Sequence, residues 1–507
     1  MTKKTLILLG FVITKLILQY FLISPEYELH RDEYLHLDQA HHLAWGYLSV
    51  PPVTSFISYI ILLLGNSYFW IKFFPALFGA LTIVVVWKTI ETLGGNLFSL
   101  FLGATAILVS ALTRINILYQ PNSLDILLWT AFYFLVIKFI QDEKPKWFYF
   151  ISLVFALGFL NKYNFVFLLL AFLPAILISE YRKIFINKHL YFSALLGFII
   201  ILPNLLWQYH NNFPVFHHLN ELARTQLVNV KRSDFLKEQL IFFIGSLFVI
   251  ISALISLLIY KPFKKYQCFL WSFILTLLIY VYLKAKGYYA IGLYPVYIAF
   301  GSVYLADVVK ESWKKYLQPI AIAIPILLFI PIYNIAFPNK SPEFIINHSK
   351  PYKDFGQLRW EDGKDHKLPQ DFADMLGWKE LALKVDRLYA QLPNKENTLI
   401  LCDNYGQAGA INYYSQQKIQ AVSFNADYVN WFDLSVHYQN LIRIKEIDGR
   451  KTELAETSPY FATSVVGDSI TNKNAREFGT TIFVFTGAKV DINNRIKKEI
   501  LEVKNYH

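Results

Sequence analysis

The stretch TLILLGFVITKLILQYFLI at residues 5–23 is predominantly apolar, and the charged pentapeptide HRDEY follows it at residues 30–34. A helix of this length spans the roughly 30 Å of hydrocarbon in a bilayer. Lys3 and Lys4 precede the run, and no small-residue cleavage site follows it, which indicates a retained helix and not a signal peptide. The carboxylates of the pentapeptide therefore lie at a membrane edge, where acidic residues are candidates for function.

The composition extends this prediction to much of the chain. Of the 507 residues, 55% are hydrophobic and 17% aromatic, and the mean hydropathy is positive. These values exceed those of an ordinary soluble domain and predict an α-helical polytopic membrane protein. Taking runs of suitable length as spans gives about eleven helices. They are residues 5–23, 69–90, 97–113, 122–140, 147–161, 163–179, 190–208, 239–260, 266–283, 288–306 and 317–336.

The charge pattern predicts the orientation. The formal net charge is +11, but the basic residues gather in short breaks between apolar runs, at 143–146, 181–188, 261–265 and 310–315. With a cytoplasmic N-terminus all four breaks lie inside, as the positive-inside rule requires. A nucleic-acid-binding protein would instead need one contiguous basic face. We therefore predict a multi-pass protein of the cytoplasmic (inner) cell membrane that has no nucleic-acid partner.

Two segments outside the spans carry structure of their own. The loop 24–68 is the longest of the outer loops, and its half 53–65 is apolar but too short to span, so we expect surface or re-entrant helices there. From residue 338 charges become frequent, 398–402 and 480–485 read as buried strands, and 377–392 has helical spacing. The predicted organisation is a transmembrane domain at 1–337 and an extracytoplasmic soluble α/β domain at 338–507.

Three carboxylates lead the candidate catalytic residues. Asp32 and Glu33 lie in the loop that follows the first apolar run. Asp125 lies in the first turn of the span at 122–140, at the same depth and on the same outer face. Each has a structural alternative, because a carboxylate also caps a helix or interacts favourably with its dipole. Their shared depth favours one outward-facing pocket.

Lysines and tyrosines near the same face suggest a phosphate site. Lys162 occupies a short outer turn, and Lys284 and Lys286 form another with Tyr288 and Tyr289. A lysine at an interface can simply extend to the headgroups. Outer cations run against the usual charge bias, however, and they would hold an anionic lipid phosphate by charge-assisted hydrogen bonds while a carboxylate acts as base.

These residues together resemble the bacterial lipid-linked-sugar glycosyltransferases of the GT-C class, in particular the protein O-mannosyltransferase-like group and the aminoarabinose transferases that modify lipid A. The resemblance covers about residues 5–310 and, more loosely, the segments 372–378 and 404–410 of the outer domain. The matching motifs are Asp32-Glu33 followed by Tyr34, Asp125-Ile126-Leu127-Leu128, Gly158 to Lys162, and Lys286-Gly287-Tyr288-Tyr289 before Tyr294-Pro295. One departure is that lysines stand where relatives use an arginine as phosphate clamp, and lysine acts as a point charge.

The resemblance implies a function. The chain would transfer a sugar from a polyprenyl-phosphate donor to a glycolipid, polysaccharide or protein acceptor on the outer face of the membrane, with inversion at the anomeric carbon. Asp32 would be the general base, and Glu33 and Asp125 would shape the acceptor site or hold a divalent metal ion. Lys162 and Lys286 would bind the donor phosphate, with Lys284, Tyr34, Tyr288 and Tyr289 lining the substrate site.

Two alternatives stay open at this point. A transporter or flippase for a lipid-linked anionic sugar also uses charges within the membrane, but such proteins usually have two related halves with a site near the midplane. Here the charges lie at one face, and no halves repeat in the sequence. A non-catalytic scaffold with an outer sensing domain would tolerate the loss of Asp32.

Overall fold

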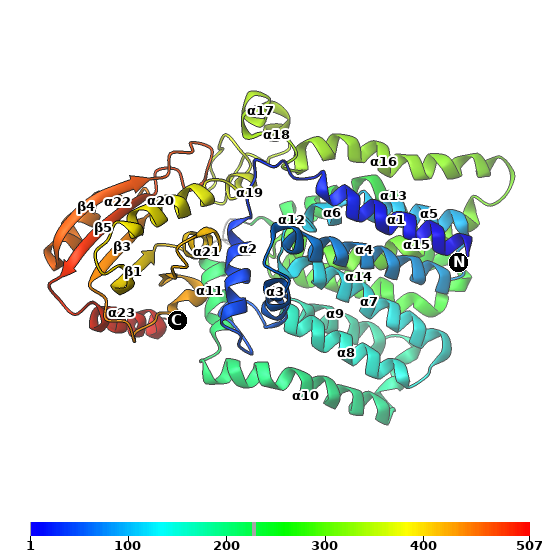
Figure 1. Cartoon of the computed structure of the whole chain (residues 1–507). Helices are drawn as coiled ribbons and strands as arrows, with labels where there is room; N and C mark the ends of the chain where they lie inside the picture. Colours follow the sequence, from blue (N-terminus) through cyan, green and yellow to red (C-terminus); the bar gives the residue numbers. More distant parts are fainter. Residues whose placement is uncertain (1, 226–229, 507) are drawn as a thin grey trace.

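The computed structural model describes residues 2–225 and 230–506 and consists of a helical bundle packed against a smaller domain with a β-sheet (Figure 1). Every apolar run predicted as a span contains a helix. The bundle helices are α1 (Lys3–Tyr20), α4 (Tyr68–Thr92), α5 (Leu97–Leu108), α7 (Pro121–Asp142), α8 (Lys146–Asn161), α9 (Phe165–Leu177), α10 (Lys188–His210), α13 (Leu247–Ile259), α14 (Gln267–Tyr282), α15 (Tyr294–Val308) and α16 (Leu317–Ala336).

The predicted number of spans is not confirmed. Among the described residues six helices are long and apolar enough to cross a membrane, or up to eight if two bent pairs each count as one span. Helices α5 and α8 have 12 and 16 residues, fewer than the about 20 that the hydrocarbon requires. Helix α9 turns by 108° into the 3-10 helix Glu180–Ile186. The chain is a multi-pass membrane protein, but apolar runs alone do not reveal where a helix bends.

The loop between α1 and α4 contains two helices, α2 (Arg31–Asp38) and α3 (Val53–Leu63). Helix α3 corresponds to the helix predicted at 53–65. The start of α2 is a capping box, because His30 Nδ1 accepts from the N–H of Asp32 and Glu33 Oε2 accepts from the N–H of His30. The two acidic residues in the first turn also stabilise α2, because their negative charges interact favourably with the helix dipole. The capping role considered for the acidic pair thus belongs to Glu33.

The domain after α16 is built on a five-stranded mixed sheet of order β2-β1-β3-β5-β4. Its strands are β1 (Thr398–Cys402), β2 (Ala421–Ser423), β3 (Asn440–Lys445), β4 (Phe461–Ser469) and β5 (Thr481–Ala488). Strands β2, β1 and β3 pair in parallel, whereas β5 pairs antiparallel with both β3 and β4. The predicted strands at 398–402 and 480–485 correspond to β1 and β5, and the predicted helix corresponds to α20 (Trp378–Ala390).

The remaining helices are short or peripheral. They are α6 (Ala111–Ile115), α11 (Pro214–Thr225), α12 (Arg232–Ile241), α17 (Pro342–Asn347), α18 (Ser349–Asp354), α19 (Gln370–Ala373), α21 (Tyr405–Tyr414), α22 (Arg450–Thr457) and α23 (Ile492–Tyr506).

The sheet domain after α16, which we call the outer domain after its predicted side of the membrane, packs on α2 through helix α21. One apolar core extends from the loop into this domain. Tyr34 on α2 is 1% exposed and lies edge-on against Trp378, with ring centroids 5.8 Å apart. Trp378 is fully buried, and its indole N–H donates to the carbonyl of Asp374 at 2.7 Å. Glu28, from the loop, accepts from the N–H groups of Trp378 and Lys379 at the start of α20. These contacts fix the sheet domain to the loop that carries α2.

Truncating Trp378 should loosen this attachment. We expect Trp378→Ala to cost about 3–5 kcal/mol, because it removes a fully buried aromatic side chain. Protease cleavage of the segment between α16 and α20 should become faster, measured as the rate of release of the sheet domain in detergent. Trp313→Ala is the matched control, since Trp313 is 65% exposed. Equal cleavage rates in the two variants would contradict this account of the interface.

Candidate active site

Glu33 lies on the bundle side of α2 and is fully buried. Its carboxylate oxygens accept from Lys72 Nζ at 2.6 and 2.7 Å and from the N–H groups of Tyr119 and His30, each at 2.7 Å. Lys72 comes from α4 and also donates to the carbonyl of Ile117 at 3.0 Å. Glu33 therefore ties α2 to two parts of the bundle. This position differs from the acceptor-shaping or metal-holding position that we predicted for it.

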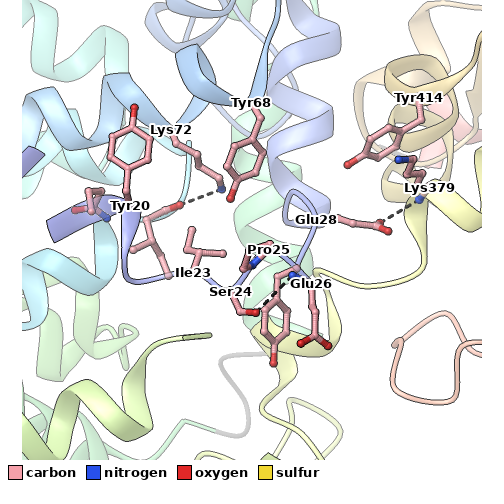
Figure 2. Close-up of a pocket in the computed structure, with 13 residues that line it drawn as sticks. Tyr20, Ile23, Ser24, Pro25, Glu26, Glu28, Tyr68, Lys72, Lys379 and Tyr414 are labelled. Atoms are coloured by element: carbon pink, nitrogen blue, oxygen red, sulfur yellow. Dashed lines mark hydrogen bonds between the residues drawn. The ribbon is translucent and has the colours of Figure 1, made fainter. Parts of the chain in front are cut away.

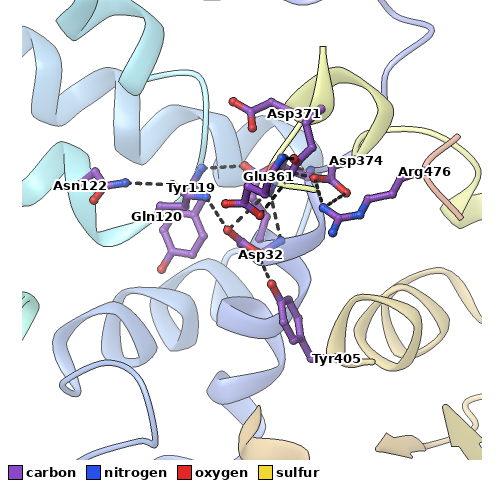
Figure 3. Close-up of polar contacts among 12 residues, drawn as sticks. Asp32, Tyr119, Gln120, Asn122, Glu361, Asp371, Asp374, Tyr405 and Arg476 are labelled. Carbon is purple, nitrogen blue, oxygen red and sulfur yellow. Dashed lines mark hydrogen bonds and ion pairs between the residues drawn. The ribbon is translucent and has the colours of Figure 1, made fainter. Parts of the chain in front are cut away.

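Asp32, one residue earlier, points toward the outer domain (Figure 3). Tyr405 Oη on α21 donates to its Oδ1 at 2.6 Å, and Gln120 Nε2 donates to its Oδ2 at 3.0 Å. The side chain keeps 35% of its area exposed, so solvent reaches it. Burial raises the pKa of Asp32, but the neighbouring His30 and Arg31 and the Tyr405 hydrogen bond together outweigh burial, and the pKa lies below its usual value. Asp32 is therefore ionised at neutral pH and accessible.

Basic groups surround Asp32. His30 Nδ1 lies 3.8 Å from Asp32 Oδ2, and the guanidinium of Arg31 lies 4.6 Å from the centroid of the Tyr405 ring. Arg476, from the outer domain, pairs with Asp374 at 3.0 Å. A cavity of about 340 Å³ adjoins this cluster, and its lining includes Arg31, Glu361 and Arg476. Arg31 and Arg476 thus lie on the two sides of the contact between the loop and the outer domain. The cavity lining also holds five carboxylates, those of Glu361, Asp362, Glu446, Asp448 and Glu477.

Asp125 and Lys162 form a second group at the start of α7 and the end of α8. Asp125 is 4% exposed; its Oδ2 accepts from Asn164 Nδ2 at 3.5 Å, and its Oδ1 has no hydrogen-bond partner among the described residues. Lys162 Nζ lies 5.3 and 4.6 Å from the ring centroids of Tyr288 and Tyr289. The structure therefore brings the predicted lysine turn and the predicted tyrosine turn together.

A chain of side-chain amides connects the two groups. Gln120 donates to Asp32, Asn122 Nδ2 donates to Gln120 Oε1 at 2.9 Å, and Lys162 Nζ donates to Asn122 Oδ1 at 2.7 Å. Figure 3 shows Gln120, just before α7, between Asp32 and Asn122, which lies in the first turn of α7. The predicted base and the predicted phosphate-binding lysine therefore belong to one hydrogen-bonded network.

The other predicted residues occupy different places. Lys286 Nζ pairs with Glu361 Oε1, in the segment between α18 and α19, at 3.2 Å. The turn at 284–289 therefore also contacts the outer domain. Lys284 is exposed at the surface. Tyr34, which we predicted to line the substrate site, has its ring buried in the core between α2 and α20, with its hydroxyl 3.3 Å from that of Tyr414.

The described residues contain no group of three or more His, Cys, Asp or Glu side chains placed to hold a metal ion. Glu33 has its oxygens occupied by Lys72 and backbone donors, so it does not fit a metal ligand. The Oδ1 atom of Asp125 is buried and has no hydrogen-bond partner among the described residues.

Several residues of this network escaped the sequence analysis. Lys72 had a usable signal, since it is a lysine within the apolar stretch YFWIKFF at the start of α4, where a charge needs a partner. Gln120 and Asn122 lie beside Asp125 in sequence, but amides carry no pattern that marks them as ligands. Tyr405 lies in the segment 404–410 that forms part of the family resemblance, but nothing in the sequence marked it as a partner of Asp32. Arg476 carried no signal. Only the packing of the outer domain brings both residues close to α2.

Comparison with known proteins identifies the class of fold. The model of the dolichyl-phosphate-mannose-protein mannosyltransferase family matches residues 49–207. ArnT from Cupriavidus metallidurans in the apo state aligns over 95% of this chain and 98% of its own, with a TM-score of 0.64 and 13% identity. The same protein bound to undecaprenyl phosphate aligns over the same shares with a TM-score of 0.61 and 12% identity. No curated protein sequence matches the chain.

These findings confirm the resemblance to the GT-C class. The chain has the fold of ArnT over nearly its whole length, outer domain included. The segment from the loop before α3 through most of α10 matches the mannosyltransferase-family model. At this level of identity the likeness to ArnT concerns the fold, and the chemistry is argued from the residues of this chain.

The buried Glu33–Lys72 pair gives a direct stability test. Glu33→Gln should cost about 3–5 kcal/mol, because it leaves the Lys72 ammonium buried without its charge partner. The double variant Glu33→Gln/Lys72→Met should recover part of this loss, since it removes both charges. Thermal unfolding of the purified protein in detergent measures both effects.

The control for this test is the pair Lys88–Glu91 on α4, whose side chains are 53% and 27% exposed. Exposed pairs are worth about 0–1 kcal/mol, so Glu91→Gln should have little effect on unfolding. A small effect of Glu33→Gln, or an additive loss in the double variant, would show that the pair does not hold α2 in place.

Proposed function

We propose that the chain is a membrane glycosyltransferase that moves a sugar from a polyprenyl-phosphate donor to an acceptor on the outer face of the cytoplasmic membrane. The observation that carries the proposal is the network in which ionised, accessible Asp32 is linked through Gln120 and Asn122 to Lys162. A base joined to a cation by neutral amides provides the two functions that phosphate-leaving sugar transfer needs. The match to the mannosyltransferase family and the ArnT fold support this reading.

The proposed reaction is a direct displacement. The acceptor hydroxyl oxygen attacks the anomeric carbon, the bond from that carbon to the phosphate oxygen breaks, and the hydroxyl proton passes to Asp32. The product has inverted configuration, and the leaving group is polyprenyl phosphate. Lys162 stabilises the negative charge that grows on the phosphate, and Lys286, in the turn that contacts the outer domain, adds to it.

The orientation of the protein follows from the same proposal. Helix α2 and the outer domain lie together at one end of the bundle, and Asp32 lies between them (Figures 1 and 3). Lys286 pairs there with Glu361. We place this end on the extracytoplasmic face of the inner membrane, where a lipid-borne sugar is presented from the bilayer. The acceptor class, whether glycolipid, polysaccharide or protein, is open. The cavity beside Arg31 and Arg476 offers it an entry from the outer side.

Other residues act indirectly in this scheme. Asp125 would orient the acceptor or the sugar, whereas Glu33 would position α2 through Lys72. Tyr288 and Tyr289 would hold the Lys162 ammonium over their rings.

Asp32→Asn should abolish transfer while leaving the donor bound. Loss of a general base typically costs a factor of about 10²–10⁴ in rate. The measurement is the transfer of radiolabelled sugar from polyprenyl-phosphate donors in membranes at matched expression, together with donor binding to the purified variant. Asp433→Asn, at an exposed turn, is the control. Equal transfer by the native chain and Asp32→Asn would refute the base assignment, and no transfer from any donor would favour the flippase.

Tyr405→Phe should change the pH dependence of transfer. Asp32 acts as base only when it is ionised, and the Tyr405 hydrogen bond favours the ionised form. Removing the hydroxyl raises the pKa of Asp32, so the acid limb of the rate profile moves to higher pH while transfer at alkaline pH is kept. Tyr413→Phe is the matched control, because Tyr413 lies on the same helix but donates to the carbonyl of Asn66. Identical profiles for Tyr405→Phe and the native chain would contradict the proposed coupling.

A further inference from the structure

Lys15 lies within α1, the first predicted span, and the proposed reaction does not use it. Its side chain is 2% exposed, and most residues around it on the helix are apolar. An ionisable side chain inside a membrane segment is costly and by default marks a function. Lys15 Nζ donates to Gln19 Oε1 at 3.0 Å and to Thr113 Oγ1 at 3.1 Å. Both acceptors are neutral, and Lys15 forms no ion pair within the described part of the chain, so charge neutralisation does not explain the lysine.

The bond to Thr113 joins α1 to a segment that lies 98 residues later in the sequence. Thr113 is fully buried in α6, and its hydroxyl donates to the carbonyl of Leu108, the last residue of α5, at 2.7 Å. One hydroxyl therefore accepts from α1 and donates to the end of α5. This arrangement fixes the start of the segment that leads from α6 to α7.

Asn116, which follows α6, lies beside the same lysine. A β-carbon on Gly79 of α4 would lie 2.2 Å from Asn116 Oδ1 and 2.7 Å from Lys15 Cε, so glycine leaves room for both groups here. Asn116 Nδ2 donates to Ser123 Oγ, in the first turn of α7, at 3.0 Å. Lys15, Thr113, Asn116 and Ser123 thus form a buried polar cluster that extends from α1 to α7.

The cluster lies at the base of the loop that carries the amides of the candidate active site. We call residues 117–122 the bridge loop, and the hydrogen bond between the two residues that flank it closes its base. The bridge loop contains Gln120 and Asn122. Among the described residues, the side chains of these two bond only to each other, to Asp32 and to Lys162. The placement of the two amides therefore depends on the loop.

Other contacts hold the first half of the bridge loop. Lys72 Nζ donates to the carbonyl of Ile117 at 3.0 Å (Figure 2). Tyr119 donates its N–H to Glu33 at 2.7 Å and its hydroxyl to the carbonyl of Thr54 on α3 at 2.8 Å. These contacts come from α2, α3 and α4, whereas the Lys15 cluster adds α1 and holds the base of the loop.

We propose that Lys15 is a positioning residue of the candidate active site: it holds the base of the bridge loop through Thr113, and the loop holds Gln120 against Asp32. A lysine suits this role, because its long stem reaches from α1 to α6 and its amine has N–H groups for both acceptors. The consequence for catalysis rests on the proposed function. A displacement of about 1 Å caused by a residue remote from the chemistry can cost a factor of about 10² in rate.

The first test uses no donor and measures how firmly the loop is held. Amide hydrogen exchange is followed by mass spectrometry in the peptide that covers residues 113–122, with the full-length protein in phosphatidylcholine nanodiscs. Lys15→Met removes both hydrogen bonds but keeps an unbranched side chain, and it should raise exchange in this peptide several-fold. The thermal midpoint of this variant should stay equal or rise, because a buried amine without a charge partner is removed.

Thr113 provides the matched variants. Thr113→Val removes the acceptor and should raise exchange as Lys15→Met does, whereas Thr113→Ser keeps the hydroxyl and should exchange like the native chain. Thr130→Val is the control, since Thr130 is 1% exposed but its hydroxyl donates to the carbonyl of Ile126 within α7. Unchanged exchange in both Lys15→Met and Thr113→Val would overturn the inference.

The second test determines whether Lys15 acts on transfer through Gln120. Lys15→Met should lower the transfer rate by up to about 10²-fold and move the acid limb of its pH profile to higher pH, because the Gln120 bond favours ionised Asp32. The double variant Lys15→Met/Gln120→Met should have the rate of Gln120→Met alone, since the lysine acts through the amide already removed. Losses that multiply in the double variant would overturn the route through Gln120.

The two tests separate this inference from the proposed function. If the native chain transfers no sugar from any donor, the proposed function fails, while the exchange test still decides whether Lys15 holds the bridge loop. If transfer occurs and Lys15→Met leaves its rate and pH profile unchanged, Lys15 is not a positioning residue, whatever the exchange shows.

Discussion

The ion pair between Glu33 and Lys72 is the interaction on which the rest of the site depends. Placing a carboxylate and an ammonium in a dry interior is costly, and the cost is offset only when every oxygen and proton is well bonded. Glu33 meets this condition, because its carboxylate accepts three kinds of hydrogen bond. The donors are Lys72 Nζ on α4, the N–H of Tyr119 before α7, and the N–H of His30 at the start of α2. The direction of α2 relative to the bundle is therefore fixed at one residue.

The opposite side of α2 is fixed by the outer domain. Asp38 accepts from Tyr428 Oη at 2.7 Å and from Asn412 Nδ2 at 2.6 Å, and burial raises the pKa of Asp38 to about 6. Near the first turn Tyr405 donates to Asp32. Asp32 thus lies at a joint where the bundle supplies Gln120 and the outer domain supplies a tyrosine. In this arrangement the outer domain contributes a side chain, Tyr405, to the candidate site.

The sequence predicted the features that depend on local pattern. Apolar runs located every bundle helix, short buried apolar stretches located β1 and β5, and adjacency to the first helix singled out Asp32 and Glu33. Patterns that depend on packing were not predictable. Consecutive residues on a helix point about 100° apart, so Asp32 and Glu33 look alike in sequence but face different surroundings. Tyr34 reads as a possible ligand residue, yet the outer domain buries it against Trp378.

The number of spans illustrates the same limit. The run at 163–179 is apolar throughout, but α9 ends at Leu177 and the chain then turns by 108°. Hydropathy measures the preference of a segment for lipid and not its path through it. Lys162 and the tyrosine turn, by contrast, were predicted separately, and the fold places them together.

The central claim is that Asp32 deprotonates an acceptor that directly displaces polyprenyl phosphate. The anomeric configuration of the product tests it most directly. A donor of defined configuration would be incubated with the purified protein and acceptor-bearing membranes, and the new glycosidic linkage assigned by NMR coupling constants. The account predicts a product of inverted configuration. A product that retains the donor configuration would require a covalent or two-step route and would contradict it.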